Sequence, residues 1–493
     1  MASDSEEPFG VVREAGASQT LWMMEKGLTD VPGLLERYHI TRSQLGFDSC
    51  VVVSARYNAD GILLNRQTLY PALHRVILNH PALSVQAYVP GNPKAKPRFV
   101  RLPVVLLNDV VSFAEGSKGS NTEQLIAEQF TRPFELGTSA PLWRLSVVSG
   151  RTVVFAYHHA IGDGQSGLAF HSALLAALNH PSDTLHIYGD KISIPMMTYL
   201  VPAVETLTSV AVSFGTFCSA LFGAFAPKSL TKGASAWTGN TIVNAATTQT
   251  HVRCWEIAAD QATDLVTICR KNKTTLTACL HTLVAGVLAR LVSTSANKPR
   301  KPFKTLSTSL PVSLRRYTGA SPHVMCDHVS GIYTYVPLAS LANTSTSDPW
   351  FSWSAAAQFN KRIQASMKKS REAIGTIRYL FVLGISQAFF LGALGKKRQY
   401  ALELSNLGRF PAPPTGEDDQ PNQVVWSVSN VYFAQCDAVV GAAMKMNVAG
   451  SPTGTVNITF TWGHGALEDE FAEALIRDTQ AALKWVIESS LID

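Results

Sequence analysis

One short polar segment constrains the fold more than any other part of this chain. Residues 157–167 read YHHAIGDGQSG, and they lie between an apolar run at 152–159, typical of a strand, and a helical pattern at 166–178. A second strand-like run at 142–148 comes before them, across the turn sequence Ser149-Gly150, and predicts an antiparallel hairpin. Loops between a strand and a helix are frequent places for functional residues. We therefore expect a strand, loop and helix unit with a site on its loop.

The two adjacent histidines of this segment cannot both face one cavity. Alternation along a strand places His159 on the same face as Phe155 and Tyr157, and His158 on the opposite face. Each ring could simply be a hydrogen-bonded histidine at a strand end, and a lone histidine would favour that interpretation. The density of polar residues in the whole segment favours a functional site instead.

Three kinds of chemistry fit the segment, and the first is dinucleotide binding. Gly162, Gly164 and Gly167 satisfy the pattern G-x-G-x-x-G between a strand and a helix. Asp183 or Asp190 follows at a distance suited to a ribose hydroxyl. That fingerprint needs a parallel βαβ unit at its start, whereas the hairpin predicts antiparallel strands. The dinucleotide interpretation is therefore the weaker one.

The second chemistry is metal binding through His158, His159 and Asp163. Adjacent histidines on a strand diverge, and the sequence contains neither H-E-x-x-H nor a cysteine cluster. Its seven cysteines are far apart and never form C-x-x-C, which also argues against a disulfide framework and indicates a reducing compartment. We expect no metal.

The third chemistry is acyl transfer by a general-base histidine. His158, His159, Asp163 and Gly164 form the signature H-H-x-x-x-D-G. With this signature the chain resembles the CoA-dependent acyltransferases of the chloramphenicol acetyltransferase-like fold, which include plant acyltransferases and peptide-synthetase condensation domains. Within that superfamily it is most similar to the fungal alcohol acetyltransferases. Shorter stretches add to the resemblance, at 35–38, 54–57, 73–83, 141–144, 311–315 and 405–408.

The resemblance implies an α/β (α+β) fold of two chloramphenicol acetyltransferase-like lobes. Each lobe would contain a mixed sheet with flanking helices, and an active-site tunnel would run between them. The length of 493 residues agrees with two lobes, because single hydrophobic cores stop growing at about 250–300 residues. We expect an N-terminal lobe at 1–185, an apolar crossover segment at 186–240 and a C-terminal lobe at 241–493.

The resemblance also implies roles for the residues of the signature. His159 would be the general base that takes the proton of the acceptor, and His158 would support the site. Asp163 would turn away from the histidine and pair with an arginine of the second lobe. The matching position is Arg315, with Arg316 as the alternative. Without the resemblance, both arginines would be expected at a solvated strand end.

Further residues receive roles from the resemblance or from their charge. Gly164 would permit a tight turn and a close approach of the backbone. Ser405 and Asn406 could donate hydrogen bonds to an oxyanion in the tunnel, although Ser-Asn-Leu-Gly also fits a plain turn. Lys301 and Lys304 belong to a basic segment that could meet the phosphates of CoA, although such a segment is more commonly a solvated loop.

The low charge of the chain is compatible with a membrane contact. Charged residues make up 16% of the sequence, against about 25% in typical soluble domains. Residues 207–226 contain no charge over a length that could span a bilayer, but Ser, Thr and Gly interrupt the segment. We expect a buried or interfacial helix there, with peripheral membrane contact, and a transmembrane span as the alternative. The stretch 379–395 is similar but shorter.

Partners and compartment follow from charge and from the start of the chain. The net charge of +6 is spread out and comes with no nucleic-acid motif, so binding to DNA or RNA is not expected. The first residues are acidic and polar, which argues against a secretory or mitochondrial leader. We expect a cytoplasmic monomer, peripheral on a membrane.

The function that we expect is acetyl transfer from acetyl-CoA to a hydroxyl of a lipophilic small molecule, in fungal secondary metabolism. Acetyl-CoA or another acyl-CoA would be a co-substrate, with no permanently bound cofactor. The alternative on the same fold is an N-acyltransferase, or a condensation-type enzyme fed by a carrier protein. The alternative from a different class is a non-catalytic, membrane-associated protein that retains the fold.

Overall fold

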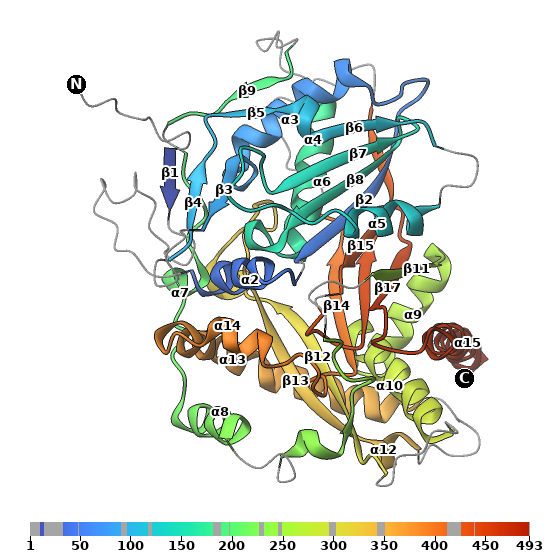
Figure 1. The fold of residues 1–493 in the computed structure, drawn as a ribbon. Coiled ribbons are helices and arrows are strands. Elements are labelled where there is room, and N and C mark those ends of the chain that lie inside the picture. The colour runs from blue at the N-terminus through green and yellow to red at the C-terminus, as the bar shows by residue number, and fades with distance from the viewer. Residues whose placement is uncertain are drawn as a thin grey trace.

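The computed structural model describes residues 10–13, 33–47, 49–89, 96–116, 121–180, 189–196, 198–225, 231–244, 249–294, 302–342, 351–411, 425–437 and 439–492. These residues form two lobes, each built on a mixed sheet with flanking helices (Figure 1). The expected α/β fold class is confirmed.

The sheet of the N-terminal lobe positions the H-H-x-x-x-D-G loop. Its strand order is β15 (Ser427–Gln435), β2 (Cys50–Asn58), β8 (Thr152–His158), β7 (Trp143–Val148) and β6 (Val111–Ala114). Side chains of β2 and β8 alternate between two apolar clusters. One cluster packs under α3 (Arg66–Asn79) and α6 (Gly164–Asn179), and the other packs under α5 (Thr122–Phe130). Burial on both faces fixes the strand that ends at the loop.

The predicted hairpin is present between β7 and β8, which pair antiparallel with Trp143 opposite Tyr157. Ser149 and Gly150 have φ values of 52° and 61°, so both central residues of the turn lie in the left-handed region. Turns of this kind match the twist of antiparallel strands. Strand β8 also pairs antiparallel with β2, so the loop does not belong to a parallel dinucleotide-binding unit.

The C-terminal lobe has a larger sheet. Its order is β10 (Ala236–Trp237), β12 (Thr305–Ser313), β14 (Leu402–Arg409), β16 (Met444–Gly450), β17 (Val456–Gly463) and β11 (Thr250–Ile257), with β13 (Val329–Pro337) paired to β12. One apolar core joins this sheet to three helices: α9 (Ala259–Lys271), α10 (Leu276–Thr294) and α15 (Asp469–Ile492). Among the described helices, α10 alone is long and apolar enough to cross a membrane, and 67% of its most apolar window is buried.

Sheet membership does not follow the expected division of the chain at 185 and 240. Strand β15 belongs to the segment 241–493, yet it pairs antiparallel with β2 in the N-terminal sheet. Strand β2 is apolar at most positions and buried on both faces, so it needs a neighbour on each side. The C-terminal half of the chain supplies that neighbour, and the two lobes share a strand.

Three helices come together beside the junction of the two lobes, on the left in Figure 1, and the longest of them continues across the C-terminal lobe. They are α2 (Leu34–Gln44), α13 (Trp353–Val382) and α14 (Ser386–Leu391). The long helix α13 was not predicted, because its apolar residues are interrupted by many charges and amides. The apolar stretch 379–395 is divided between α13 and α14 rather than forming one helix.

The segment 207–226 contains a helix over part of its length, and its expected membrane contact stays a prediction. Helix α7 (Val204–Leu207) ends where the segment begins, and only Phe214–Phe225 is helical, as α8. The segment is not buried either, since Phe214 is 82% exposed and Phe222 is 54% exposed. A helix of 12 residues is about 18 Å long, whereas a bilayer core is about 30 Å thick, so α8 cannot span it.

The remaining elements are short. They are β1 (Gly10–Arg13), β3 (Val85–Tyr88), β4 (Arg98–Arg101), β5 (Val104–Leu106), β9 (Lys191–Ser193), α4 (Leu107–Val110), α11 (Arg315–Thr318) and α12 (Leu338–Ala342). Strands β1, β4 and β3 form a small sheet, and β5 pairs with β9.

Candidate active site

His159 lies at the wall of a large cavity between the lobes. It follows β8 directly and begins a short 3₁₀ turn, His159–Ile161. The cavity has a volume of about 770 Å³, and residues of both lobes line it. The side chain of His159 is 15% exposed, and it is one of the lining residues. The signature loop therefore opens into a space large enough for a small-molecule substrate.

His158 points the other way, as the strand alternation predicts. Its ring is buried, and its Nδ1 accepts a hydrogen bond of 3.0 Å from the backbone N–H of Ala160. That bond leaves the proton on Nε2, which lies 2.6 Å from the hydroxyl of Ser43. Burial lowers the pKa of His158 to about 3. His158 thus holds the strand end in place and does not line the cavity.

Asp163 and Arg315 are brought together across the lobe interface. Arg315 Nη2 lies 2.9 Å from Asp163 Oδ1, and both side chains are buried. Arg315 also donates through Nη1 to the carbonyls of Ser321 and Val324. The alternative, Arg316, is exposed and donates to the hydroxyl of Tyr317 instead.

The carboxylate of Asp163 is also tied to its own loop and to the second lobe. Its Oδ1 accepts from the backbone N–H and the hydroxyl of Ser166, so that Asp163 caps the N-terminus of α6. Its Oδ2 accepts from the backbone N–H of His328. Burial alone would raise the pKa of Asp163, but the charge of Arg315 and these hydrogen bonds bring it below its usual value. Asp163 therefore fixes the loop and does not orient His159.

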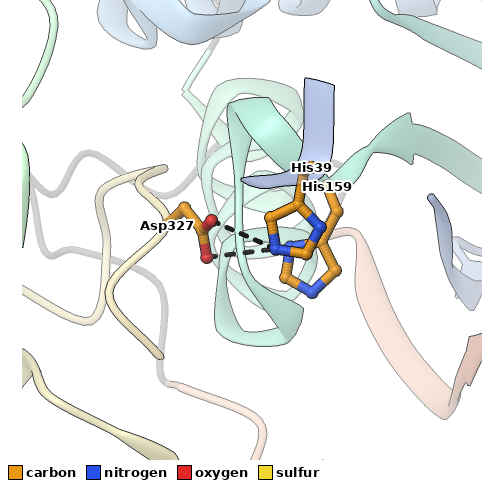
Figure 2. Close-up of side chains that lie close together, drawn as sticks. All are labelled: His39, His159 and Asp327. Carbon is orange, nitrogen blue, oxygen red and sulfur yellow. Dashed lines mark ion pairs between the residues drawn. The ribbon is translucent and has the colours of Figure 1, made fainter. Parts of the chain in front are cut away.

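Two residues that the sequence analysis did not single out complete the site. Figure 2 shows His39, from α2, and Asp327, from the segment before β13, next to His159. Asp327 Oδ1 lies 3.7 Å from His159 Nδ1, and Asp327 Oδ2 lies 3.5 Å from His39 Nε2. The two imidazole rings are stacked, with centroids 3.9 Å apart and an interplanar angle of 6°. One carboxylate thus faces two parallel rings.

The side chain of Asp327 is 0% exposed. Within the described part of the chain, neither of its oxygens has a hydrogen-bond partner. Burial, together with the charge of Asp163, raises the pKa of Asp327 well above its ordinary value. Burial is also the main cause that lowers the pKa of His159 to about 4, while its own backbone carbonyl acts in the opposite direction. The imidazole of His159 is therefore neutral at physiological pH, with Nδ1 toward Asp327 and Nε2 turned away from it (Figure 2).

His39, His159 and Asp327 are close enough together to be possible metal ligands. One ligand atom from each lies within 4.8 Å of the others. A zinc ion would sit about 2.0–2.1 Å from each nitrogen, close to the plane of each ring. The ring planes are almost parallel and 3.9 Å apart at their centroids, so an ion in one plane lies far out of the other. The nitrogen lone pairs do not converge, and the arrangement of these three residues does not favour a metal.

Gly164 is required for a reason other than a turn. It is the first residue of α6 and does not have a positive φ, so its backbone conformation does not by itself require glycine. A Cβ atom at Gly164 would lie 2.6 Å from Leu407 and 3.0 Å from the ring of Phe433. Both neighbours come from β14 and β15. The expected close approach is therefore present, between the signature loop and the second half of the chain.

The remaining predicted residues separate into those near the cavity and those away from it. Ser405 lines the cavity on β14. Asn406, the next residue on that strand, points to the other face, where it donates to the hydroxyl of Thr277 on α10. Because neighbouring residues of a strand point to opposite faces, Asn406 faces away from the cavity and is not placed to donate to an oxyanion there. Lys304 is exposed just before β12 and does not line the cavity, and Lys301 lies outside the described residues.

The cavity has a polar region and an apolar region. Polar side chains include Arg42, Ser405, Gln435 and Lys445. The apolar region includes side chains from α8, α13 and α14, with aromatic rings such as Phe217, Tyr379 and Phe389. Strand residues such as Val51 and Phe433 also contribute apolar lining. Such a division suits a ligand with a reacting polar group and a lipophilic body.

Sequence comparisons identify the family of the chain. The model of the alcohol acetyltransferase family matches residues 32–475. The probable alcohol acetyltransferase crmB of Aspergillus fumigatus is 27% identical over 476 residues, covering 89% of this chain and 96% of that protein. The probable alcohol acetyltransferase FCK4 of Fusarium pseudograminearum is 25% identical, covering 95% of this chain and 94% of that protein.

Solved structures agree with the fold. The trichothecene 15-O-acetyltransferase TRI3 of Fusarium sporotrichioides has a TM-score of 0.61 at 11% identity, over 92% of this chain and 94% of that one. The condensation domain of the monacolin K polyketide synthase MokA has a TM-score of 0.59 at 12% identity, over 92% of this chain and 96% of that one. The family match spans nearly the whole chain and includes both halves of the site. The chain is an acyltransferase enzyme and belongs to the alcohol acetyltransferase family.

Proposed function

We propose that this enzyme transfers an acetyl group from acetyl-CoA to the hydroxyl of a lipophilic small molecule, with His159 as general base. One observation carries the proposal above the others: His159 is a neutral imidazole at the wall of a cavity of about 770 Å³, and Asp327 faces its Nδ1. A base in this state accepts a proton through Nε2. The motif match and the family support the same assignment.

The reaction follows as direct transfer. The acceptor hydroxyl gives its proton to His159 Nε2 while its oxygen attacks the thioester carbonyl of acetyl-CoA. The tetrahedral intermediate collapses with loss of the C–S bond, and the histidine returns the proton to the leaving thiolate. The products are the acetate ester and free CoA. The sequence lacks a G-x-S-x-G nucleophile elbow, and the proposed reaction needs no acyl-enzyme.

Asp327 would act as a positioning residue in this reaction. Its distance of 3.7 Å from His159 Nδ1 is longer than a hydrogen bond, and such contacts tighten when substrate binds. A proton on Nδ1 leaves Nε2 as the basic nitrogen. When His159 becomes positively charged, the ionised form of Asp327 is favoured beside it, because opposite charges attract strongly in a buried site.

Ser405 is the proposed donor to the oxyanion. Its hydroxyl lines the same cavity as His159, on strand β14 of the opposite lobe. A donor placed there could stabilise the negative charge that develops on the thioester oxygen.

The acceptor class follows from the apolar region of the cavity. Helices α8, α13 and α14 supply apolar and aromatic side chains there. A lipophilic alcohol of the size of a fungal secondary metabolite fits this chemistry, and the structural neighbour TRI3 is a trichothecene 15-O-acetyltransferase. We further propose a cytoplasmic monomer in peripheral contact with a membrane.

The test mixes purified protein with acetyl-CoA and a panel of lipophilic alcohols and amines and follows the release of free thiol. His159→Ala should lower the acceptor-dependent rate by about 10²–10⁴-fold, the usual contribution of a general base, and leave acetyl-CoA binding intact. His464→Ala is the matched control, because His464 is exposed and does not line the cavity. Acylation of amines alone, or turnover only with a carrier-bound acyl donor, would replace this proposal by the alternative activities. A His159→Ala rate near that of the wild type would refute the mechanism.

A further inference from the structure

Exposed apolar side chains gather at one end of the cavity. Phe214 and Phe222 of α8 are 82% and 54% exposed. Val382, at the end of α13, is 73% exposed, and the next residue, Leu383, is 64% exposed. Ile385 is 44% exposed just before α14. We call these five residues the apolar rim.

The apolar rim lies beside an opening of the cavity. Leu383 and Ile385 are exposed to solvent and also line the cavity, so they lie at its mouth. Helix α8 is held beside the end of α13, because the rings of Phe217 and Tyr379 pack with centroids 5.5 Å apart. Both of these rings line the cavity as well. The opening is thus bounded by side chains that water solvates poorly.

Charged side chains near the rim are mainly basic, with one acid, Glu372, beside α8, where its carboxylate accepts hydrogen bonds from the backbone N–H and the hydroxyl of Ser213. Residues 375–400 contain the basic side chains of Arg378, Lys396, Lys397 and Arg398 and no acidic side chain, and 207–226 contain no charge. Arg378, Lys396 and Lys397 are exposed. Lys397 donates to the backbone carbonyls of Gly233 and Ala234. Arg378 stands four residues before Val382 in the chain, and Lys396 stands eleven residues after Ile385. Surfaces that combine exposed apolar side chains with neighbouring cations bind anionic lipid bilayers.

We propose that the apolar rim docks on an anionic lipid bilayer, so that a membrane-dissolved acceptor enters the cavity directly from the lipid. The second part of this proposal rests on the proposed acetyltransferase function. Helix α8 is too short to span a bilayer, but it can lie in the interface with its phenylalanines inserted. The bilayer then covers the mouth, and a lipophilic alcohol reaches His159 without crossing water. CoA, with its charged phosphates, would use another entrance.

Binding to vesicles tests the surface without any need for turnover. The full-length protein is sedimented with vesicles of phosphatidylcholine alone and with vesicles that also contain phosphatidylserine. We expect stronger binding to the anionic vesicles, and at least tenfold weaker binding for the double variant Phe214→Glu with Val382→Glu. Neither of these two side chains lines the cavity. Leu63→Glu with Met196→Glu is the matched control, because these apolar residues are 47% and 69% exposed on the other lobe.

A second double variant tests the charge. Arg378→Gln with Lys396→Gln should weaken binding to the anionic vesicles by about fivefold for each charge and leave binding to phosphatidylcholine unchanged. A rise in the KM for acetyl-CoA in this variant, without weaker vesicle binding, would assign the two cations to the CoA phosphates and overturn the proposal.

Kinetics tests the route of the acceptor. The Phe214→Glu, Val382→Glu variant should keep the wild-type rate on a short, water-soluble alcohol and lose at least tenfold on a long-chain alcohol carried in anionic vesicles. Vesicle binding that equals the wild type in this variant, or wild-type protein that binds neither vesicle, would overturn the lipid assignment. Rim-dependent vesicle binding by a protein that acetylates no alcohol would contradict the proposed function and leave the docking surface in place.

Discussion

Substitution of Asp163 by Asn should destabilise the protein more than it changes the chemistry directly. The change keeps the side-chain size and an oxygen for the N–H of Ser166, but it removes the charge that lies 2.9 Å from Arg315 Nη2. Breaking a buried ion pair by removing one partner costs about 3–5 kcal/mol. Arg315 keeps its bonds to Ser321 and Val324, which favours the lower end, about 3 kcal/mol. That is a large part of the typical stability of about 5–15 kcal/mol.

The assay is equilibrium unfolding in urea, followed by tryptophan fluorescence, for the wild type, Asp163→Asn, Arg315→Gln and the double variant. The double variant should lose clearly less stability than the sum of the single losses, because the two residues act as one pair. The folded-state pKa of Asp163 is depressed, so its contribution is present above the unfolded value of 3.8 and is lost as pH falls through the folded pKa. The loss in Asp163→Asn should therefore shrink in acid. A loss below about 1 kcal/mol at neutral pH, or additive single losses, would refute the reasoning.

Three further results are expected from the site. The acidic limb of the pH profile of kcat/KM should have an apparent pKa near 4, because His159 must be neutral to act as a base. An apparent pKa near 6.5 would contradict the burial of His159. Asp327→Asn should lower kcat at least tenfold, because the preferred tautomer of His159 is lost. Asp327→Asn should also raise the melting temperature at neutral pH. A buried acid with a raised pKa stabilises the fold only at low pH, and this contribution is lost as pH rises. An unchanged kcat in Asp327→Asn would exclude the positioning role. Gly164→Ala should lower the free energy of unfolding by about 1–3 kcal/mol, because the new Cβ would lie 2.6 Å from Leu407. Gly215→Ala is the control and should not destabilise the protein, because no atom lies within 4 Å of a Cβ there. Equal effects of the two substitutions would show that the close approach at Gly164 is unimportant.

Local patterns predicted the signature loop well. The hairpin, the strand that ends at His158 and the helix after Asp163 all depend on residues next to one another in the chain. The opposite directions of His158 and His159 followed from strand alternation alone. The contact between Asp163 and Arg315 joins distant segments, and it was expected only because of the resemblance to a known family.

Contacts between distant segments could not be predicted from patterns. His39 and Asp327 reach His159 from a helix and a loop far away in sequence, and no spacing rule links the three. The signals available were indirect: Asp327 belongs to a polar segment just before a strand, and His39 follows a stretch that carried the resemblance. Helix α13 was missed because its mixed composition hides its apolar face, which became apparent only from its packing at the mouth of the cavity.

The shared strand β15 has a consequence for how the enzyme is made. Val53 pairs with Phe433, so the N-terminal sheet is incomplete until a strand 380 residues further along the chain (433 minus 53) has left the ribosome. Domains commonly fold as units during synthesis, N-terminal first, but this one cannot be completed that way. Phe433 also packs against Gly164, so the signature loop reaches its final shape only after β15 has been translated. A nascent or C-terminally truncated chain should therefore hold the H-H-x-x-x-D-G sequence without a working base, and its unpaired β2 edge would be a site for chaperone binding or aggregation.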